Sequence, residues 1–506
     1  MMKPLRWLDD WLNNITMYRL LLYGLGILVA IAVVFCFTGT LTLSGNGLLL
    51  STVILLAVCY GANKLLGKLF DAPTNSESSL ITALILVCIL PQATTVSKAL
   101  YIGLAGLLAV ASKYIVAWRH KHLFNPAAFG ALLVGLFGLI YANWWIGNPT
   151  MLPFVLILGL LIVKKIRRFP LVIAFAIAAL GLGIIVGVNH GQVFGQNLHN
   201  IVMSGPLVFF GTIMLTEPST TPPTRYYQLL YGVLVGILFS SQLHFRTLYA
   251  SPQTALILGN LFAWGVSYKA RLRLKLKTKH QISAQVFDYV FAPDRPLRFM
   301  PGQYMEWTLP HHGVDGRGNR RTFTIASSPT ENEVHLGIKF YEPSSSFKRR
   351  LAAMKPGDTM TAGMVAGDFL LSADKNAKFV WIAGGIGITP FRSMATYLTH
   401  TQEKRDIALI YQVSNPDELA YREIFEHAQA NGLKLIPLLG AKEIPPDWKG
   451  HTGYVTPELL KQEVPDFKQR RYYISGPNAM VQNYKRMLRQ AGVPMSHIVT
   501  DYFSGY

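Results

Sequence analysis

The chain has 506 residues, of which 51% are hydrophobic and 15% are charged, with a formal net charge of +20. This length predicts about three domains, and the apolar excess excludes a chain that is soluble throughout. No base-reading or aromatic–basic array accompanies the positive charge. We therefore exclude nucleic acid as a partner and attribute the charge to basic loops that orient a membrane protein.

Apolar runs fill the chain up to about Tyr268, and the sequence from Lys269 onwards is mixed and charged. A spanning helix needs about 20 residues, with tolerance for tilt and polar flanks. We count ten runs, at residues 19–38, 47–62, 80–90, 97–118, 126–142, 151–163, 170–188, 205–215, 227–241 and 249–268. The first is too long for a cleavable signal peptide.

Loop charges predict how these runs are oriented. With the N-terminus in the cytoplasm, most basic loop residues lie on the cytoplasmic side, and only Lys98 and Arg246 lie near the opposite surface. Ten crossings then return the C-terminal part to the cytosol, where NAD(P)H is found. We expect a multi-pass protein of the bacterial inner (cytoplasmic) membrane, with lipid around residues 1–268.

Two runs, 80–90 and 205–215, are short and end in similar sequences, Cys88–Thr95 and Met214–Thr221. They are the third and eighth of ten, as an inverted repeat of two five-helix halves requires, and matched short segments point to a site near the bilayer midplane. The alternative is a chance likeness of two proline-terminated helices. The predicted site lies near Pro91, Thr94, Thr216, Glu217 and Pro218, with Phe209 and Phe210 close by.

The cysteines and histidines limit the cofactors of this part. Cys36, Cys59 and Cys88 all fall in apolar runs, so four thiolates for an iron–sulfur cluster are not available in this chain. A disulfide framework is equally unexpected. The histidines of this part lie in loops or at the ends of runs, which disfavours a bis-histidine haem stack. We expect no metal site.

The remaining sequence predicts two further domains. Residues 269–373 read as a small antiparallel β-barrel, with strand-like alternation from Leu272 to Val290 and a turn at Pro301–Tyr304. Residues 374–506 read as a Rossmann-like α/β domain. Its buried strand Phe379–Ala383 leads through the glycine-rich turn Gly384–Pro390 into a helix at about Phe391, an arrangement that brings phosphates close to a helix N-terminus.

Four short motifs carry a resemblance: Arg321-Thr322-Phe323-Thr324, Gly384–Pro390, Ser475-Gly476-Pro477 and the terminal Phe503–Tyr506. In this order and spacing they resemble the ferredoxin–NADP reductase superfamily. The resemblance implies an FAD-containing, NAD(P)H-dependent oxidoreductase. It implies these cofactor-binding residues: Arg321, Phe323, Thr324, Ser345 and Ser346 for FAD, and Gly384, Gly385, Gly387, Thr389, Pro390, Gly476 and Pro477 for the nicotinamide dinucleotide.

The resemblance also implies individual roles. Arg321 pairs with the FAD pyrophosphate, Phe323 packs on the flavin, and Thr324 hydrogen-bonds near the flavin N5. Ser475, where relatives carry cysteine, lies beside the nicotinamide. Tyr506 either covers the flavin until the nicotinamide displaces it or packs against the sheet. Thr324, Ser475 and Tyr506 are thus the catalytic candidates.

The cofactor choice depends on the segment after the strand near residues 407–411. Relatives recognise the adenosine ribose there, and NADP-selective members often carry a cation. Here Ser414-Asn415-Pro416 follows, and the next cation is Arg422. We therefore favour NADH over NADPH.

The motif His122–Ala127, with Ser112-Lys113-Tyr114 before it and Leu215–Pro218 later, looks like the family of the Rnf complex D subunit and the sodium-pumping NADH:quinone reductase B subunit. That family implies a flavin-carrying electron conduit in a 5+5 inverted-repeat fold. The Ser-Gly-Ala-Thr segment that takes a covalent FMN in relatives is missing, so a second flavin would be held non-covalently, with Thr216 and Glu217 as its candidate ligands.

Together these features predict a ten-helix all-α transmembrane domain, an antiparallel FAD-binding β-barrel and a nicotinamide-binding α/β domain. We expect electrons to pass from NAD(P)H through FAD into the membrane domain, toward a quinone or an extracytosolic acceptor, directly or through a partner electron carrier. A redox-coupled ion transporter of the Rnf type and a redox sensor are the alternatives. Glu217 is nearly alone as an intramembrane acid, which argues against ion coupling.

Overall fold

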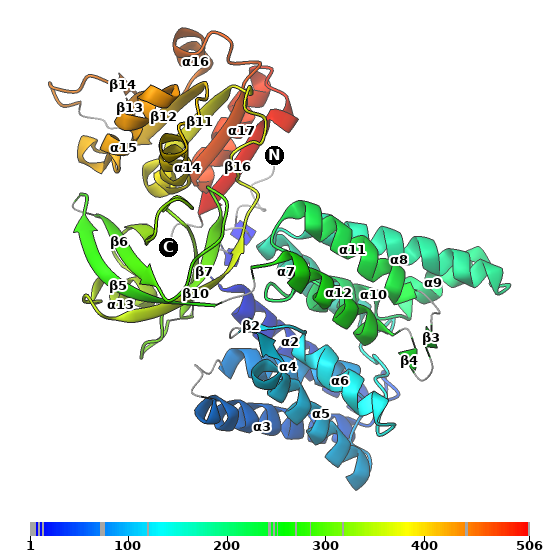
Figure 1. Ribbon diagram of the computed structural model, residues 1–506. Helices are drawn as coiled ribbons and strands as arrows, with labels where there is room; N and C mark the ends of the chain where they lie inside the picture. The colour runs from blue at the N-terminus through cyan, green and yellow to red at the C-terminus, as the bar shows by residue number, and fades with distance from the viewer. Residues whose placement is uncertain are drawn as a thin grey trace. The chain divides into compact units, whose positions relative to one another are not determined.

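The computed structural model describes residues 7–8, 11–12, 15–70, 76–118, 121–240, 244–245, 248–249, 251–268, 271–283, 285–315, 318–440 and 444–503. The chain forms two compact units, Met1–Arg271 and Leu272–Tyr506, drawn in Figure 1. Tyr506, one of the catalytic candidates, lies outside the described residues, as does Lys269 at the expected domain boundary.

The first unit is helical. Its helices are α2 (Met17–Phe37), α3 (Gly45–Leu69), α4 (Ser76–Ile89), α5 (Val96–Ile115), α6 (Pro126–Leu136), α7 (Leu152–Ile166), α8 (Phe169–Asn189), α9 (Phe194–Met203), α10 (Leu207–Phe209), α11 (Arg225–Ser240) and α12 (Pro252–Val266). Four helices within the described ranges, α2, α3, α5 and α8, are long and apolar enough to cross a membrane. Ten crossings therefore stay a prediction.

Capping residues and prolines set where several of these helices begin. Thr16, Ser44, Thr95 and Ser251 each accept a hydrogen bond from a backbone N–H of the first turn, which satisfies a donor that has no partner within the helix. Proline occupies the first turn of α6, α7, α8 and α12, where its missing N–H has no cost.

Helix contacts recur along the chain. α2 contacts α4 and α7 contacts α10; α3 contacts α5 and α8 contacts α11; α5 contacts α6 and α11 contacts α12. A two-stranded hairpin precedes α6 (β1, Ala117–Trp118; β2, Lys121–His122), and another precedes α12 (β3, His244–Phe245; β4, Leu248–Tyr249). The sequence predicted neither the hairpins nor the amphipathic helix α9.

Both segments that were expected to be short are short. α4 has 14 residues, and the three-residue α10 continues into a π-helical turn at Phe210–Met214. π-turns inside helices often lie at functional sites. Thr216 and Glu217 follow this turn directly, so the candidate membrane residues lie where a buried helix ends.

The second unit begins with a six-stranded antiparallel barrel of strand order β8-β7-β10-β5-β6-β9. The strands are β5 (Leu272–Gln281), β6 (Val286–Pro293), β7 (Tyr304–Thr308), β8 (Arg320–Thr324), β9 (Val334–Lys339) and β10 (Thr359–Ala366), with helix α13 (Ser346–Ala352) between the last two. The alternating run from Leu272 to Val290 is thus a hairpin of two strands, β5 and β6.

A parallel sheet of order β14-β13-β12-β11-β15-β16 completes the unit. Its strands are β11 (Phe379–Gly384), β12 (Ile407–Val413), β13 (Leu433–Leu439), β14 (His451–Thr452), β15 (Arg471–Pro477) and β16 (Ile498–Phe503). Residues of α14 (Thr389–His400) and α15 (Arg422–His427) join the core on one face. Residues of α16 (Pro457–Glu463) and α17 (Asn478–Gln490) join the core on the other (Figure 1).

Candidate functional site

The first motif lies on β8. Arg321 is 9% exposed, and its Nη1 donates to the carbonyl oxygens of Gly318 at 3.0 Å and Arg320 at 2.7 Å. Its guanidinium carbon lies 5.3 Å from the centre of the Phe347 ring, and the Phe323 ring lies 5.9 Å from the same ring. Ring packing thus holds the arginine beside the start of α13.

The second predicted phosphate-binding group meets the first. The Ser346 N–H donates to Oδ2 of Asp315 at 2.7 Å, and Nη2 of Arg321 lies 3.6 Å from Oδ1 of the same carboxylate. Ser345 caps its own helix, accepting from the Lys348 N–H at 3.3 Å. A buried guanidinium and a backbone donor therefore converge on one anionic group of this chain, which is the chemistry that a diphosphate requires.

Among the buried hydroxyls of the described residues that have no partner, one lies in the first motif and one in the third. Thr324 is 3% exposed and Ser475 is fully buried, and neither hydroxyl has a hydrogen-bond partner among the described residues. Buried polar groups are normally satisfied. Hydroxyls left in this state at the two motifs therefore fit a flavin and a nicotinamide that supply the missing hydrogen bonds.

The glycine-rich turn is built as the sequence indicated, with one correction. β11 ends at Gly384, a 3₁₀ turn covers Gly385–Ile388, and α14 begins at Thr389 rather than near Phe391. A Cβ at Gly387 would lie 2.5 Å from the carbonyl oxygen of Ser475, so only glycine permits this approach. The turn therefore packs directly on β15.

β15 carries the third motif to the same edge of the sheet. Ser475 is paired with Ala383 in the parallel ladder between β15 and β11, and Gly476 and Pro477 end the strand. Ligands of open α/β sheets bind outside the carboxyl ends of the strands. The structure thus brings the second and third motifs together at such an edge.

A cation that sequence reasoning missed lies close to the segment after β12. Lys339, at the end of the barrel strand β9, pairs with Glu418 at 2.6 Å, close behind the Ser414-Asn415-Pro416 segment. Lys339 is distant in sequence, so no local pattern could have revealed it. Its charge is neutralised by Glu418, and Arg422 is paired with Glu426.

We therefore expect NADH to exceed NADPH in kcat/KM by about tenfold or more. A 2′-phosphate would bring negative charge to a segment whose nearest cations are already paired, and charge-assisted contacts carry most of such a preference. Steady-state rates with both nucleotides test this. The variant Glu418→Gln removes the charge that neutralises Lys339, so it should lower the ratio of kcat/KM for NADH to that for NADPH. Equal kcat/KM values for the two nucleotides in the unchanged protein would contradict the expected preference for NADH.

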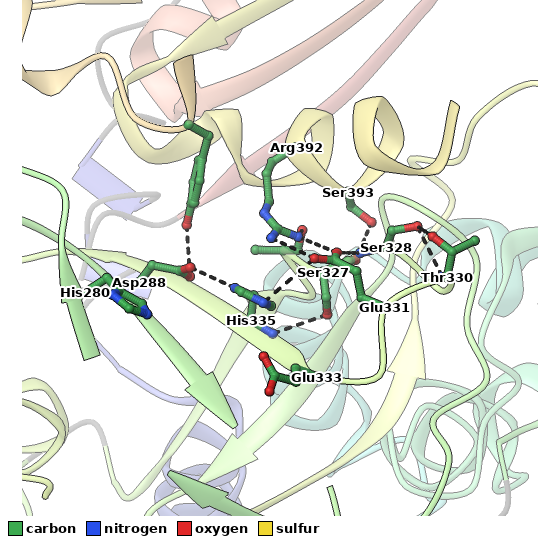
Figure 2. Close-up of polar contacts among 12 residues, drawn as sticks. His280, Asp288, Ser327, Ser328, Thr330, Glu331, Glu333, His335, Arg392 and Ser393 are labelled. Atoms are coloured by element: carbon green, nitrogen blue, oxygen red, sulfur yellow. Dashed lines mark hydrogen bonds and ion pairs between the residues drawn. The ribbon is translucent and has the colours of Figure 1, made fainter. Parts of the chain in front are cut away.

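A buried ionic network joins the barrel to the α/β lobe, and Figure 2 shows it. Arg392 of α14 contacts Glu331 at 2.6 and 2.9 Å, while Asp288 contacts Nδ1 of His335 at 2.7 Å and Tyr421 at 3.1 Å. Burial opposes ionisation of Asp288 and Glu331, but their hydrogen bonds and the charges of His335 and Arg392 hold both pKa values below the ordinary range. The sequence offered no signal for this network.

These shifts predict acid sensitivity. Both carboxyls stay ionised to lower pH in the folded protein than in the unfolded chain, so they stabilise the fold above about pH 5 and lose that contribution as pH falls through their folded pKa values. Thermal unfolding of the full-length protein between pH 7 and pH 2 should show a steeper decline for the unchanged protein than for Asp288→Asn, because the folded pKa of Asp288 lies below its ordinary value. Parallel declines would refute the assignment.

The first unit holds a second polar cluster, and it corrects the expectation that Glu217 is nearly alone. Asn125 at the start of α6 donates to Glu217 at 2.8 Å, and Nε2 of His122 lies 3.7 Å from the same carboxylate. Asn260 of α12 accepts from the Asn125 N–H at 2.8 Å and donates to Tyr231 of α11 at 3.2 Å. Residues from four segments distant in sequence, that of Glu217 included, thus form one connected cluster.

Thr216 and the nearby aromatic residues occupy the same region. The Thr216 hydroxyl donates to the Thr212 carbonyl oxygen at 2.8 Å, so it satisfies the backbone of the preceding turn. Phe209 and Phe210 are buried, and the Phe210 ring packs against those of Trp144, Phe175 and Phe239. The Phe210 ring is thus part of an aromatic cluster, and its closeness to Glu217 stays a prediction.

Comparison with known proteins decides what the second unit is. Residues 273–369 match the model of the oxidoreductase FAD-binding domain, and residues 381–486 match that of the oxidoreductase NAD-binding domain. The C-terminal unit is an FAD- and NAD-binding reductase. We call it the reductase unit, residues 272–506. Its matched domains support an NAD(P)H-dependent FAD oxidoreductase activity for this unit.

Relatives of this unit are also named as reductases. The reductase unit is similar to the glycine betaine monooxygenase reductase subunit of Chromohalobacter salexigens, with 25% identity over 42% of this chain and 59% of the relative. It is also similar to the reductase component of phenol 2-monooxygenase from Pseudomonas sp. (strain CF600), with 29% identity over 37% of this chain and 53% of the relative. The chain thus spans little more than half the length of these relatives.

One solved structure is also similar to part of this chain. The ferredoxin NADP⁺ reductase of Neisseria gonorrhoeae with bound FAD and NADP aligns with 47% of this chain and 99% of its own, at a TM-score of 0.40 and 19% identity. No family match covers the first unit among those found, so the Rnf-type resemblance rests on its short motifs.

Proposed function

We propose that this chain is a membrane-bound oxidoreductase that takes electrons from cytosolic NAD(P)H and passes them through its own helical unit to a quinone or an acceptor on the far side of the membrane. The observation that carries the proposal is a reductase unit continuous in sequence with a unit containing four helices able to cross a membrane. The relatives are named as reductase subunits of monooxygenases, so delivery to an acceptor outside the flavin unit fits their type.

The binding residues follow from the site. Arg321 and the Ser346 N–H would hold the FAD diphosphate, Thr324 would contact the flavin, and the Gly384–Ile388 turn with Ser475 would hold the nicotinamide dinucleotide. When bound, FAD accepts two electrons from NAD(P)H and releases them one at a time. With a quinone as acceptor, NAD(P)H, one proton and the quinone give NAD(P)⁺ and the quinol.

We further propose that the acceptor reaches the polar cluster around Glu217. The cluster lies where the α10 π-turn ends, and a broken helix inside a membrane requires polar partners or a lined cavity. Ionisable groups within a membrane are rare and mark functional sites. Electrons and protons would meet there, because His122 and Glu217 are the protonatable pair of the cluster.

The recurring helix contacts support the proposed 5+5 repeat. Contacts of α2 with α4, of α3 with α5 and of α5 with α6 each have a counterpart five helices later, if α9 is treated as an insertion. The matching hairpins before α6 and α12 follow the same order. We place both termini in the cytosol of a bacterial cell, on the loop-charge argument.

A redox-coupled ion transporter is the second candidate. The pairing of Glu217 with His122 favours it, because an intramembrane acid–base pair is the usual element of proton coupling. Both candidates require the same reductase unit. They differ in whether ions are pumped across the membrane during turnover.

Full-length protein in sealed lipid vesicles separates these alternatives. With NADH outside, we expect oxidation to be slow alone and to accelerate more than about tenfold when a short-chain quinone is added. With the added quinone as the acceptor and no acceptor trapped inside, a pH- or potential-sensitive dye inside the vesicles should stay silent if no ions are pumped. NADH oxidation that no quinone and no trapped internal acceptor accelerates would refute the proposed route.

A further inference from the structure

The ionic network in Figure 2 lies between the two lobes of the reductase unit and has no part in cofactor binding as described above. From the barrel come Asp288 of β6, His335 of β9 and Glu331 of the loop before β9. From the α/β lobe come Arg392 of α14 and Tyr421 at the start of α15.

Arg392 makes the strongest connection. Arg392 is 4% exposed, and its two terminal nitrogens donate to the two Glu331 carboxylate oxygens at 2.6 and 2.9 Å. Its Nη1 also donates to the Ala326 carbonyl oxygen at 2.8 Å. Two-pronged arginine–carboxylate pairs fix orientation as well as distance. The fully buried Ser393 adds a bond to the Ser327 carbonyl oxygen at 2.6 Å.

Tyr421 and Asp288 make a second connection between the lobes. Tyr421 donates to Asp288 Oδ1 at 3.1 Å while His335 holds Oδ2 at 2.7 Å. Between them the lobes approach closely, since a Cβ on Gly337 of β9 would lie 2.6 Å from the Tyr421 hydroxyl oxygen and 2.7 Å from a Thr389 methyl carbon. The barrel strand therefore presses on the first residue of α14.

The attachment points are adjacent to the two reactive motifs. Ala326 and Ser327 follow Thr324 by two and three residues, just after strand β8, which carries the flavin motif. Arg392 and Ser393 follow Thr389 by three and four residues, at the end of the nicotinamide turn. The network thus attaches to the chain within two to four residues of each motif.

We propose that Arg392 and Glu331, supported by Tyr421 and Asp288, are positioning residues that set the separation between the flavin strand and the nicotinamide turn. They act on electron transfer from NAD(P)H to FAD and touch neither cofactor. This inference rests on the oxidoreductase activity of the reductase unit and is independent of the membrane route. A misplacement of about 1 Å can slow a transfer of this kind about 100-fold.

The test compares Glu331→Gln with a matched control, Glu403→Gln, in the full-length protein. Glu403 pairs with Arg405 at 2.6 Å between α14 and β12, at the amino ends of the parallel strands. The side-chain exposures match closely: 18% and 5% for Glu331 and Arg392, 15% and 3% for Glu403 and Arg405. Both substitutions remove one buried carboxylate charge, but only the first lies between the lobes.

Anaerobic single-turnover mixing with NADH gives the first measurement. In Glu331→Gln we expect the limiting rate of FAD reduction to fall about 10- to 100-fold, while the NADH Kd changes less than about threefold and FAD content stays full. NADH deuterated at the transferred position should show a larger isotope effect than in the unchanged protein. Glu403→Gln should keep the original rate.

Hydrogen exchange of the full-length protein, measured without NADH, gives a second measurement that needs no turnover. Backbone amides of α14 and of residues 325–335 should exchange faster in Glu331→Gln and stay unchanged in Glu403→Gln. Tyr421→Phe, which deletes one hydroxyl, keeps the test valid if Glu331→Gln does not fold, and should slow reduction about 3- to 10-fold.

Three outcomes decide the matter. Slower reduction with an unchanged NADH Kd, together with local loosening, supports the proposal. Unchanged rates of FAD reduction in Glu331→Gln and Tyr421→Phe overturn the proposal, and so does an equal loss of rate in Glu403→Gln. If NADH does not reduce the FAD of the unchanged protein, the oxidoreductase activity itself fails, and that result is distinguishable because no substitution is involved.

Discussion

Replacing Arg321 with alanine is expected to raise the Kd for FAD about 10- to 100-fold, so that most of the cofactor is lost during purification of the full-length protein. Arg321 is buried beside the Ser346 N–H, and together they face one anionic group. A hydrogen bond to a charged group contributes about 1.5–3 kcal/mol, and about 1.4 kcal/mol corresponds to a tenfold change in Kd.

The neighbouring arginine is the control. Arg320 pairs with Glu306 of β7 at 3.3 Å, and successive residues of a strand point to opposite faces. Arg320→Ala should therefore keep its FAD. FAD released by denaturation, measured per chain, gives the result for both variants, and release without proteolysis is expected because no covalent link holds it. Full FAD content in Arg321→Ala would contradict the assignment.

The motifs of the reductase unit could be located from sequence because their chemistry is local. A glycine-rich turn after a buried strand can be recognised from adjacent residues alone. The helix that follows begins at Thr389, two positions before the predicted Phe391. The anion-binding pair Arg321 and Ser346 was also expected. What the sequence could not indicate was Asp315, which reaches them from the loop before β8.

Contacts between distant segments account for the rest. Arg392 and Glu331 are 61 positions apart, and Tyr421 and Asp288 are 133 apart, so no spacing rule relates them. In the first unit, hydropathy located the helices but not the partner of Glu217, since Asn125 lies 92 positions away. The two-residue strands before α6 and α12 are too short to show any alternation.

Changing Glu217 and Thr216 together to alanine is expected to slow electron transfer to the acceptor more than about tenfold and to leave the reduction of FAD by NADH intact. The double variant removes the carboxylate that holds Asn125 and faces His122. It also removes the hydroxyl that satisfies the backbone at the end of the π-turn. Loss of one partner leaves the other polar groups of a buried cluster uncompensated.

The control is Glu77→Ala. Glu77 pairs with Arg19 at 2.9 Å, and its side chain is 28% exposed against 22% for Glu217, so the two carboxylates are matched in burial and both lie in the helical unit. Single-turnover FAD reduction and steady-state quinone reduction are measured on each variant. A general loss of folding would lower both rates, whereas a defect at the acceptor site lowers only the second.

Flavin content gives an independent result for the same site. If a second, non-covalent flavin lies beside Glu217, the unchanged protein should release more than one flavin per chain, and the double variant should release only FAD. If a quinone binds there instead, flavin content stays at one in both, and only quinone turnover falls. One flavin per chain with undiminished quinone turnover in the double variant would exclude the cluster from the electron path, because a carboxylate that acts on neither the cofactor nor the acceptor has only a structural part in the helical unit.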